Sequence, residues 1–85
     1  MAFKPPILGI IFGMKLAPHQ LLGRNVGRLR NQAGLTQEKL AEKADISRGF
    51  LQEIEKGAKN PTMNVVTRLK RALRCTWDEL LRGID

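Results

Sequence analysis

The stretch from Gln37 to Lys56, QEKLAEKADISRGFLQEIEK, decides the fold, because it predicts two short helices that meet at a sharp turn. Apolar residues recur at helical spacing on one face of each helix: Leu40, Ala41 and Ala44 in the first, Leu51 and Ile54 in the second. The link is only residues 45–47, so the second helix must cross the first at a large angle. The stretch therefore predicts a helix-turn-helix unit with both apolar faces turned toward one core.

Capping residues set the bounds of these two helices. Ser47 is a favoured N-cap for the second helix, and Ile46 before it can pack on Leu51 as a hydrophobic staple. Thr36 caps the first helix in the same way. Asp45 falls in the turn where the backbone needs a positive φ, which aspartate adopts more readily than most non-glycine residues. Local sequence and the helix pattern thus agree on the same bounds.

The outer face of the second helix carries polar, charged or very small residues: Arg48, Gly49, Gln52, Glu53 and Lys56. Such a face can enter the major groove of DNA, where side chains reach the base edges. Most charged helix faces are only solvated, and a plain helical hairpin would show the same alternation. The caps, the three-residue turn and the small side chain of Ala41 near it together favour the DNA-reading interpretation.

With its flanks, this stretch makes residues 22–83 resemble the phage-repressor and Cro type of helix-turn-helix regulators, also called the xenobiotic-response-element type. The motifs that carry the resemblance are Gly34-Leu35-Thr36-Gln37, Leu40-Ala41 with Ala44, Ile46-Ser47, Ile54-Glu55-Lys56-Gly57, Pro61-Thr62 and Ala72-Leu73. In that family the helix after the turn, here residues 47–56, is the recognition helix. The resemblance implies a five-helix domain that is not an enzyme and that binds double-stranded DNA as a homodimer. Asp45 departs mildly from the usual turn glycine.

The helix pattern and the resemblance together give the candidate site. DNA-binding residues are expected on the recognition helix, at the start of the helix before it and in the loop after it: Gln37, Ser47, Arg48, Gly49, Phe50, Gln52, Glu53, Lys56, Lys59 and Asn60. Gln37 lies at a helix N-terminus, where the dipole and free N–H groups suit a phosphate. Lys59 and Asn60 are also expected to meet phosphate. The resemblance places Arg30 beside Glu55, as a clamp that fixes the angle of the recognition helix.

Three further helices complete the expected all-α fold. The first spans about residues 22–33 and ends at Gly34, and its core-facing residues are Leu22, Val26, Leu29 and Ala33. Another spans about residues 62–73 after a stop at Gly57. Its core-facing residues are Val66, Leu69, Ala72 and Leu73, and its outer residues Arg68, Lys70 and Arg71 are interpreted as a solvated face.

The last helix opens with a capping box made by Thr76 and Glu79, and Cys75 and Leu80 are its expected staple. Large apolar residues gather at this end of the chain: Trp77, Leu80, Leu81 and Ile84. They exceed what so small a core needs. We expect them to divide between closing the core and forming a dimer seam.

The domain is expected to cover residues 21–85, because residues 1–20 differ in composition. They carry three prolines and an apolar run, Ile7 to Met14, that is too short to span a bilayer. Three interpretations stay open. The segment is non-native sequence upstream of a true start at Met14, a disordered arm, or a short strand that pairs with another chain or folds back over the helices.

Composition narrows the class of protein. Eighty-five residues suffice for one small domain, which buries roughly 60% of its unfolded surface, and exclude a second. With 42% hydrophobic but only 5% aromatic residues, the core must be aliphatic. The net charge is +7, and thirteen of the fifteen Lys and Arg residues lie from Arg24 onward, so the predicted domain favours a polyanion partner.

One cysteine, Cys75, and one histidine, His19, cannot form a structural zinc site or an intramolecular disulfide. We therefore expect no cofactor and no metal, and a cytoplasmic protein without a membrane segment. No paired carboxylates or nucleophile-base set can be assembled either, so an enzyme is not expected.

The sequence thus predicts a DNA-binding transcriptional regulator, of repressor type, on a near-palindromic operator. Two alternatives stay open: an antitoxin, which would bind a toxin protein through another surface, and a protein-interaction module with a degenerate recognition helix. A protein partner such as a toxin or a polymerase is compatible with either. The operator sequence, the sign of regulation and any effector do not follow from the residues.

Overall fold

The computed structural model describes residues 15–85 of the chain. These residues form five helices and no strand: α2 (Pro18–Gln32), α3 (Gln37–Ala44), α4 (Arg48–Lys56), α5 (Met63–Leu73) and α6 (Trp77–Leu80). The predicted all-α, five-helix fold is confirmed. The interpretations of residues 1–14 as an arm, a strand or upstream sequence lie outside the described residues.

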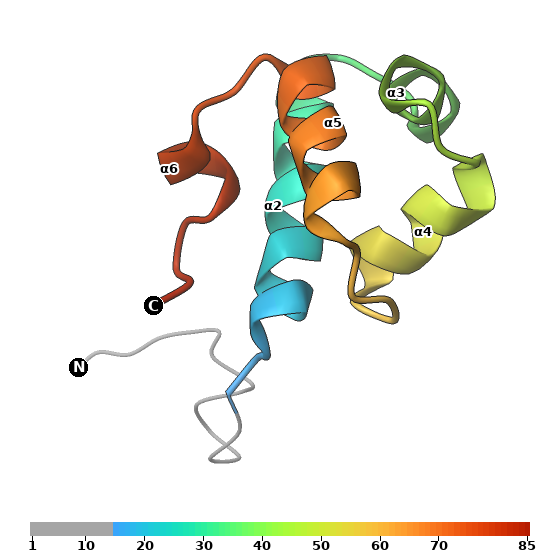
Figure 1. Cartoon of the computed structure of the whole chain (residues 1–85). Helices are drawn as coiled ribbons and strands as arrows, with labels where there is room; N and C mark the ends of the chain where they lie inside the picture. The colour runs from blue at the N-terminus through green and yellow to red at the C-terminus, as the bar shows by residue number, and fades with distance from the viewer. Residues whose placement is uncertain (1–14) are drawn as a thin grey trace.

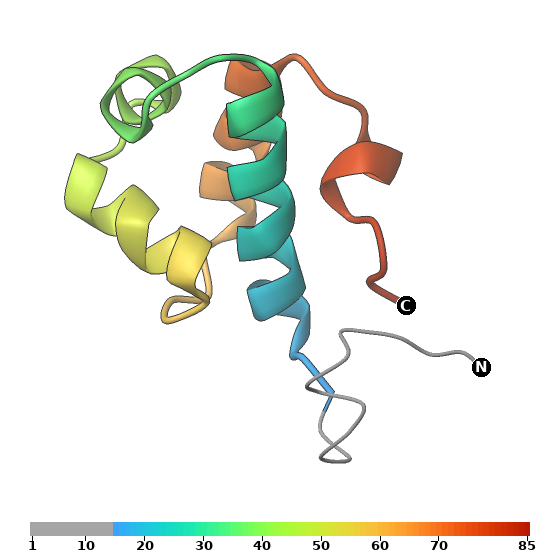
Figure 2. The ribbon, with the colours of Figure 1, turned by 180° about the vertical axis from the view of Figure 1, so that it is seen from behind.

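Helix α2 is the centre of the arrangement. It packs most extensively against α4 and also contacts α5 and α6, while α3 packs on α5 and α4. The two opposite views show α3 and α4 on one side of α2 and α6 on the other side (Figures 1 and 2). The helix-turn-helix unit and the C-terminal helix therefore lie far apart on the surface.

The core is aliphatic, as the composition predicts. Its fully buried large residues come from all five helices: Val26, Leu40, Leu51, Ile54, Leu69 and Leu80. Every helix therefore contributes to one shared core. Of the four residues expected to divide between the core and a dimer seam, Leu80 closes the core, because it is 0% exposed within a single chain.

Hydroxyl side chains begin four of the helices; the sequence predicted the caps at Thr36, Ser47 and Thr76, and the structure adds one at Thr62. Thr36, Ser47 and Thr62 each accept a hydrogen bond from the backbone N–H three residues later, at 3.0, 3.0 and 3.3 Å. Thr76 forms the predicted capping box with Glu79, whose carboxylate accepts from the Thr76 N–H at 2.8 Å. Hydrogen bonds from the Thr76 backbone and side chain lower the pKa of the Glu79 carboxyl.

Left-handed residues end three of the helices, α3, α4 and α5, and set the turn angles after them. Asp45 has φ 58° and ψ 48°, so the prediction of a positive φ in the helix-turn-helix link is confirmed. Gly57 ends α4 with φ 79°, also as predicted. Arg74 ends α5 with φ 56°, a conformation that few non-glycine residues adopt. The C-terminal bounds of α3, α4 and α5 thus follow from local backbone geometry.

The first helix differs from its predicted span at both ends. It starts at Pro18, three residues before the expected domain boundary, because proline suits the first helical position and Gln20 Oε1 accepts from the Ala17 N–H at 2.7 Å. At the other end the helix stops at Gln32. Ala33, which was expected in the core, is exposed because it is the capping residue outside the last turn.

None of the helices in the described part of the chain is long and apolar enough to span a bilayer.

Candidate nucleic-acid interface

Helix α4, the expected recognition helix, has two faces of opposite character. Leu51 and Ile54 are 0% exposed and anchor one face in the core. On the other face Arg48 and Lys56 are exposed, together with Gly49, while Gln52 and Glu53 are half-buried. The helix therefore offers a polar outer face that takes no part in the hydrophobic core.

Two other candidate residues of this helix have structural contacts. The ring of Phe50 is half-buried and packs against the core, so it does not stand fully on the outer face. The hydroxyl of Ser47 accepts from the Phe50 N–H as the N-cap. Both residues help to place α4, whereas Lys59 and Asn60 lie exposed in the loop that follows it.

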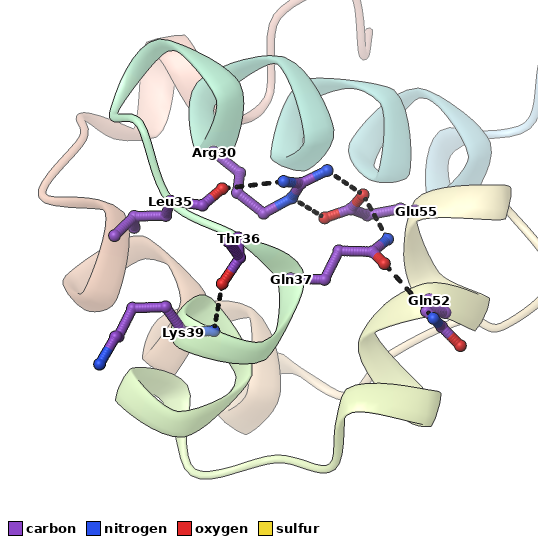
Figure 3. Close-up of polar contacts among 7 residues, drawn as sticks. All are labelled: Arg30, Leu35, Thr36, Gln37, Lys39, Gln52 and Glu55. Atoms are coloured by element: carbon purple, nitrogen blue, oxygen red, sulfur yellow. Dashed lines mark hydrogen bonds and ion pairs between the residues drawn. The ribbon is translucent and has the colours of Figure 1, made fainter.

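Arg30 on α2 and Glu55 on α4 form the predicted clamp. Arg30 Nε donates to Glu55 Oε2 at 2.8 Å and Nη2 donates to Oε1 at 3.2 Å, so the pair is bidentate (Figure 3). The side chains are only 14% and 11% exposed. Arg30 Nη1 also donates to the Leu35 carbonyl at 2.9 Å. One guanidinium thus joins α2 and α4 to the segment that leads into α3.

Gln37 extends this clamp to the outer face of α4. Its Nε2 donates to Glu55 Oε1 at 3.1 Å, and its Oε1 accepts from Gln52 Nε2 at 3.4 Å (Figure 3). The sequence predicted a phosphate contact for Gln37, which is the first residue of α3. The structure adds internal hydrogen bonds for its side chain. Thr36 caps the Lys39 N–H, and the backbone N–H groups of Gln37 and Glu38 have no partner within the helix.

The angle of α4 also depends on a glycine that the sequence did not single out. A Cβ added at Gly23 would overlap the carbonyl oxygen of Ile54 and lie 3.1 Å from the carbonyl carbon. The backbones of α2 and α4 therefore lie so close that only glycine, which has no side chain, fits at position 23. Two glycines four residues apart, Gly23 and Gly27, were the available sequence signal.

Asn25 is a second residue that sequence reasoning missed. It is 5% exposed, and its Nδ2 donates to the carbonyls of Leu80 at 2.7 Å and Arg82 at 3.0 Å. Its Oδ1 accepts from Arg28 Nη1 at 3.0 Å. The amide thus fastens the C-terminal segment to α2. Its signal in the sequence was a polar residue next to Val26 on the apolar side of the helix.

The remaining candidate seam residues differ in exposure. Trp77 is 40% and Leu81 is 37% exposed, while Ile84 is half-buried against the core. Lys70 Nζ lies 5.3 Å from the centroid of the Trp77 ring, within cation–π range. Of the four predicted seam residues, Trp77 and Leu81 are thus the large apolar groups left at the surface.

The outer charges of α5 are not all simply solvated. Arg68 Nη1 donates to the Asp45 carbonyl at 3.3 Å and lies 3.7 Å from the Asp45 carboxylate. The Asp45 side chain is 95% exposed, so this ion pair contributes little stability. It nevertheless places a guanidinium against the turn between α3 and α4.

We expect Gly49→Ala to stabilise the fold and weaken DNA binding. A Cβ at position 49 would meet nothing within 4 Å, so no packing in the fold requires glycine there. Alanine within a helix is more favourable than glycine by about 0.8–1.0 kcal/mol, which thermal unfolding would detect. The added methyl group would stand between the helix backbone and the floor of a groove. Unchanged affinity in a titration with operator DNA would show that the backbone at position 49 stays away from the bases.

Comparisons with known proteins agree with this geometry. The sequence profile of the helix-turn-helix family matches residues 26–80. An uncharacterized helix-turn-helix transcriptional regulator, y4dJ of Sinorhizobium fredii, is 36% identical over 66 residues, which cover 78% of this chain and 86% of that protein. The immunity repressor protein of Bacillus phage phi105 is 36% identical over 52 residues, which cover 61% of this chain but 36% of the repressor.

A solved structure has a similar fold. The restriction-modification controller protein C.AhdI from Aeromonas hydrophila superposes with a TM-score of 0.70 at 29% identity. The superposition covers 73% of this chain and 94% of that protein. The likeness therefore extends over most of both proteins.

Proposed function

This chain belongs to the helix-turn-helix family of DNA-binding transcriptional regulators, which are not enzymes, and on that premise we propose that it represses transcription as a homodimer on a near-palindromic operator. The observation that carries the proposal is the outer face of α4. It is polar, makes no core contact through Arg48 or Lys56, and is held at a fixed angle by the clamp between Arg30 and Glu55.

Residues of this surface divide into readers and anchors. Arg48 and Glu53 project from the outer face of α4, where arginine can pair with guanine O6 and N7 and glutamate can accept from cytosine N4. Lys59 lies on the loop after α4, where it meets phosphate and not bases. Base contacts give sequence preference, whereas phosphate contacts strengthen binding to every sequence.

We expect Arg48→Ala to cost roughly 1–3 kcal/mol of binding free energy per half-site and to relax the preference at one base pair. Lys59→Ala, the matched control, should weaken binding to all sequences alike and lower the salt slope by about one unit per contact. The measurement is a titration of each variant with a selected operator and with a scrambled duplex over a salt series.

Two results would contradict the assignment. If Arg48→Ala loses the same affinity on both duplexes, Arg48 is a phosphate anchor and not a reader. If the unmodified protein selects no duplex over bulk DNA, operator binding itself is wrong, and the interaction-module alternative gains support.

The dimer proposal rests on the surface left by α6 and the segment after it. Trp77 and Leu81 expose large apolar area. Helix α6, which begins at Trp77 and ends just before Leu81, lies on the side of α2 opposite the helix-turn-helix unit (Figures 1 and 2). A second copy of the chain, docked by a two-fold axis at this surface, would cover both side chains and leave both α4 helices free. The operator would then contain half-sites about 10 base pairs apart, centre to centre.

We expect the double variant Trp77→Ser/Leu81→Ser to be monomeric at concentrations where the unmodified protein is dimeric. Its affinity for a two-half-site operator should fall while binding to a single half-site is retained. Met63→Ser is the control, because Met63 is 66% exposed and starts α5 away from α6. The dimer proposal is contradicted if analytical ultracentrifugation finds only monomer for the unmodified protein, both free and on DNA.

A further inference from the structure

Four side chains form one series of hydrogen bonds that ends on the DNA-facing side of α4. Arg30 donates to Glu55, Gln37 donates to Glu55, and Gln52 donates to Gln37 (Figure 3). The series begins at a part-buried ion pair and reaches Gln52, which lies on the same helix face as Arg48 and Gly49. The ion pair of Arg30 and Glu55 is therefore connected through Gln37 to Gln52, a candidate for reading a base.

The direction of this series is set by the chemistry of its first members. An ionised carboxylate can only accept hydrogen bonds, and a guanidinium can only donate them. Glu55 must therefore receive the amino group of Gln37, which leaves the Gln37 oxygen turned toward Gln52. That oxygen in turn requires the amino group of Gln52. The orientation of the Gln52 amide thus follows from the charge of Glu55.

From this geometry we infer that Gln37 is a positioning residue that determines which base Gln52 reads, an inference that rests on the proposed function. With its amino group held by Gln37, Gln52 turns its oxygen toward the groove. A fixed acceptor selects a base with an exocyclic amino group in the major groove. Adenine is preferred over cytosine, because a second N–H of the amide can donate to adenine N7.

Without Gln37, the same side chain would discriminate poorly. A free glutamine amide can turn over and offer either its oxygen or its amino group, so it can also pair with guanine O6 or thymine O4. In this fold, turning the amide breaks its hydrogen bond to Gln37 and places two oxygens against each other. The base preference at this position therefore comes from α3 and α2 as well as from α4.

Three substitutions at position 37 separate the donor and acceptor roles. Gln37→Met keeps the size of the side chain without its hydrogen bonds, so the preference should fall to less than about threefold, from the fivefold to hundredfold that one good pair provides. Gln37→Lys can only donate, so it should turn the Gln52 amide and shift the preference to guanine or thymine. Gln37→Glu can only accept, and its carboxylate would face that of Glu55, so binding to every duplex should weaken. It can still receive the amino group of Gln52, so the preference that remains should be for adenine.

The readout is the ratio of affinities for duplexes that differ at one base pair, measured at low salt. That base pair is identified first, as the one whose preference disappears in Gln52→Ala. A ratio within one protein preparation is unaffected by partial unfolding, and melting curves report any loss of stability separately.

The outcomes distinguish this inference from the function on which it rests. If the unmodified protein selects no operator, the proposed function fails. If it selects one, but Gln52→Ala changes no base preference, or Gln37→Met weakens all duplexes equally, Gln37 is only a phosphate anchor and the inference is overturned. Retention of the adenine preference by Gln37→Lys would overturn it as well.

Discussion

Gly23→Ala is expected to destabilise the domain by about 3 kcal/mol or more, at the upper end of what overpacking costs. The added Cβ would overlap the Ile54 carbonyl oxygen and lie 3.2 Å from the Glu55 carbonyl oxygen. All of these atoms belong to the backbone, so no side chain can rotate away and α2 and α4 must move apart. Thermal and urea unfolding would measure the loss, at roughly 4–8 °C per kcal/mol for a domain of this size.

Gly27→Ala is the matched control on the same helix. A Cβ at Gly27 would lie 3.4 Å from the Glu55 side-chain oxygen Oε1, an ordinary contact with a side chain that can adjust. Alanine also favours the helix by about 0.8–1.0 kcal/mol, so this variant should be neutral or more stable. Equal stability of the Gly23→Ala and Gly27→Ala proteins would show that the close approach of α2 and α4 is not required.

Gly23 shows what the sequence could not predict. A pair of glycines inside a helix permits a close neighbour but does not identify it, because the closeness of two backbones depends on the angle at which the helices cross. The helix starts at residues 36, 47 and 76 were predicted, since each depends on a hydroxyl and an N–H three positions apart. Helix starts could thus be predicted from the local sequence, whereas the close approach of α2 and α4 could not.

The end of the chain illustrates the same limit. The four large apolar residues near the end of the chain are more than so small a core needs, but the sequence did not show which of them would be buried. The hydrogen bond from Asn25 Nδ2 to the Leu80 carbonyl holds this segment against α2, with the Leu80 side chain in the core. Trp77 and Leu81 are left exposed. The partner of Asn25 is 55 residues away in sequence, so no local pattern could identify it.

The clamp was predictable only in part. The family resemblance placed Arg30 beside Glu55, and the structure confirms the pair at 2.8 Å. Gln37 and Gln52 continue the hydrogen bonds toward the outer face of α4, which depends on side-chain positions from two helices. The sequence identified both glutamines as DNA-binding candidates, and the structure shows the contact between them.

Glu55→Ala is expected to cost about 2–3 kcal/mol, because breaking a buried ion pair costs about 3–5 kcal/mol and this pair keeps some contact with water. The substitution removes the acceptor of three hydrogen bonds, two from Arg30 and one from Gln37. It also leaves the guanidinium of Arg30, whose side chain is 14% exposed, without its counter-charge. Operator affinity should fall too, since α4 loses its only ion pair to α2 among the described residues.

Two variants test the cause of this loss. Glu42→Ala removes an exposed partner of Lys39, 3.4 Å away with side chains 58% and 73% exposed, and should change stability by less than about 0.5 kcal/mol. The double variant Arg30→Met/Glu55→Ala should regain part of the lost stability, because it no longer leaves the charge of Arg30 buried without a partner. A Glu55→Ala protein within about 0.5 kcal/mol of the unmodified one would mean that water solvates Arg30 as well as Glu55 does. The angle of α4 would then depend on packing, at Gly23 and in the core, and not on the ion pair.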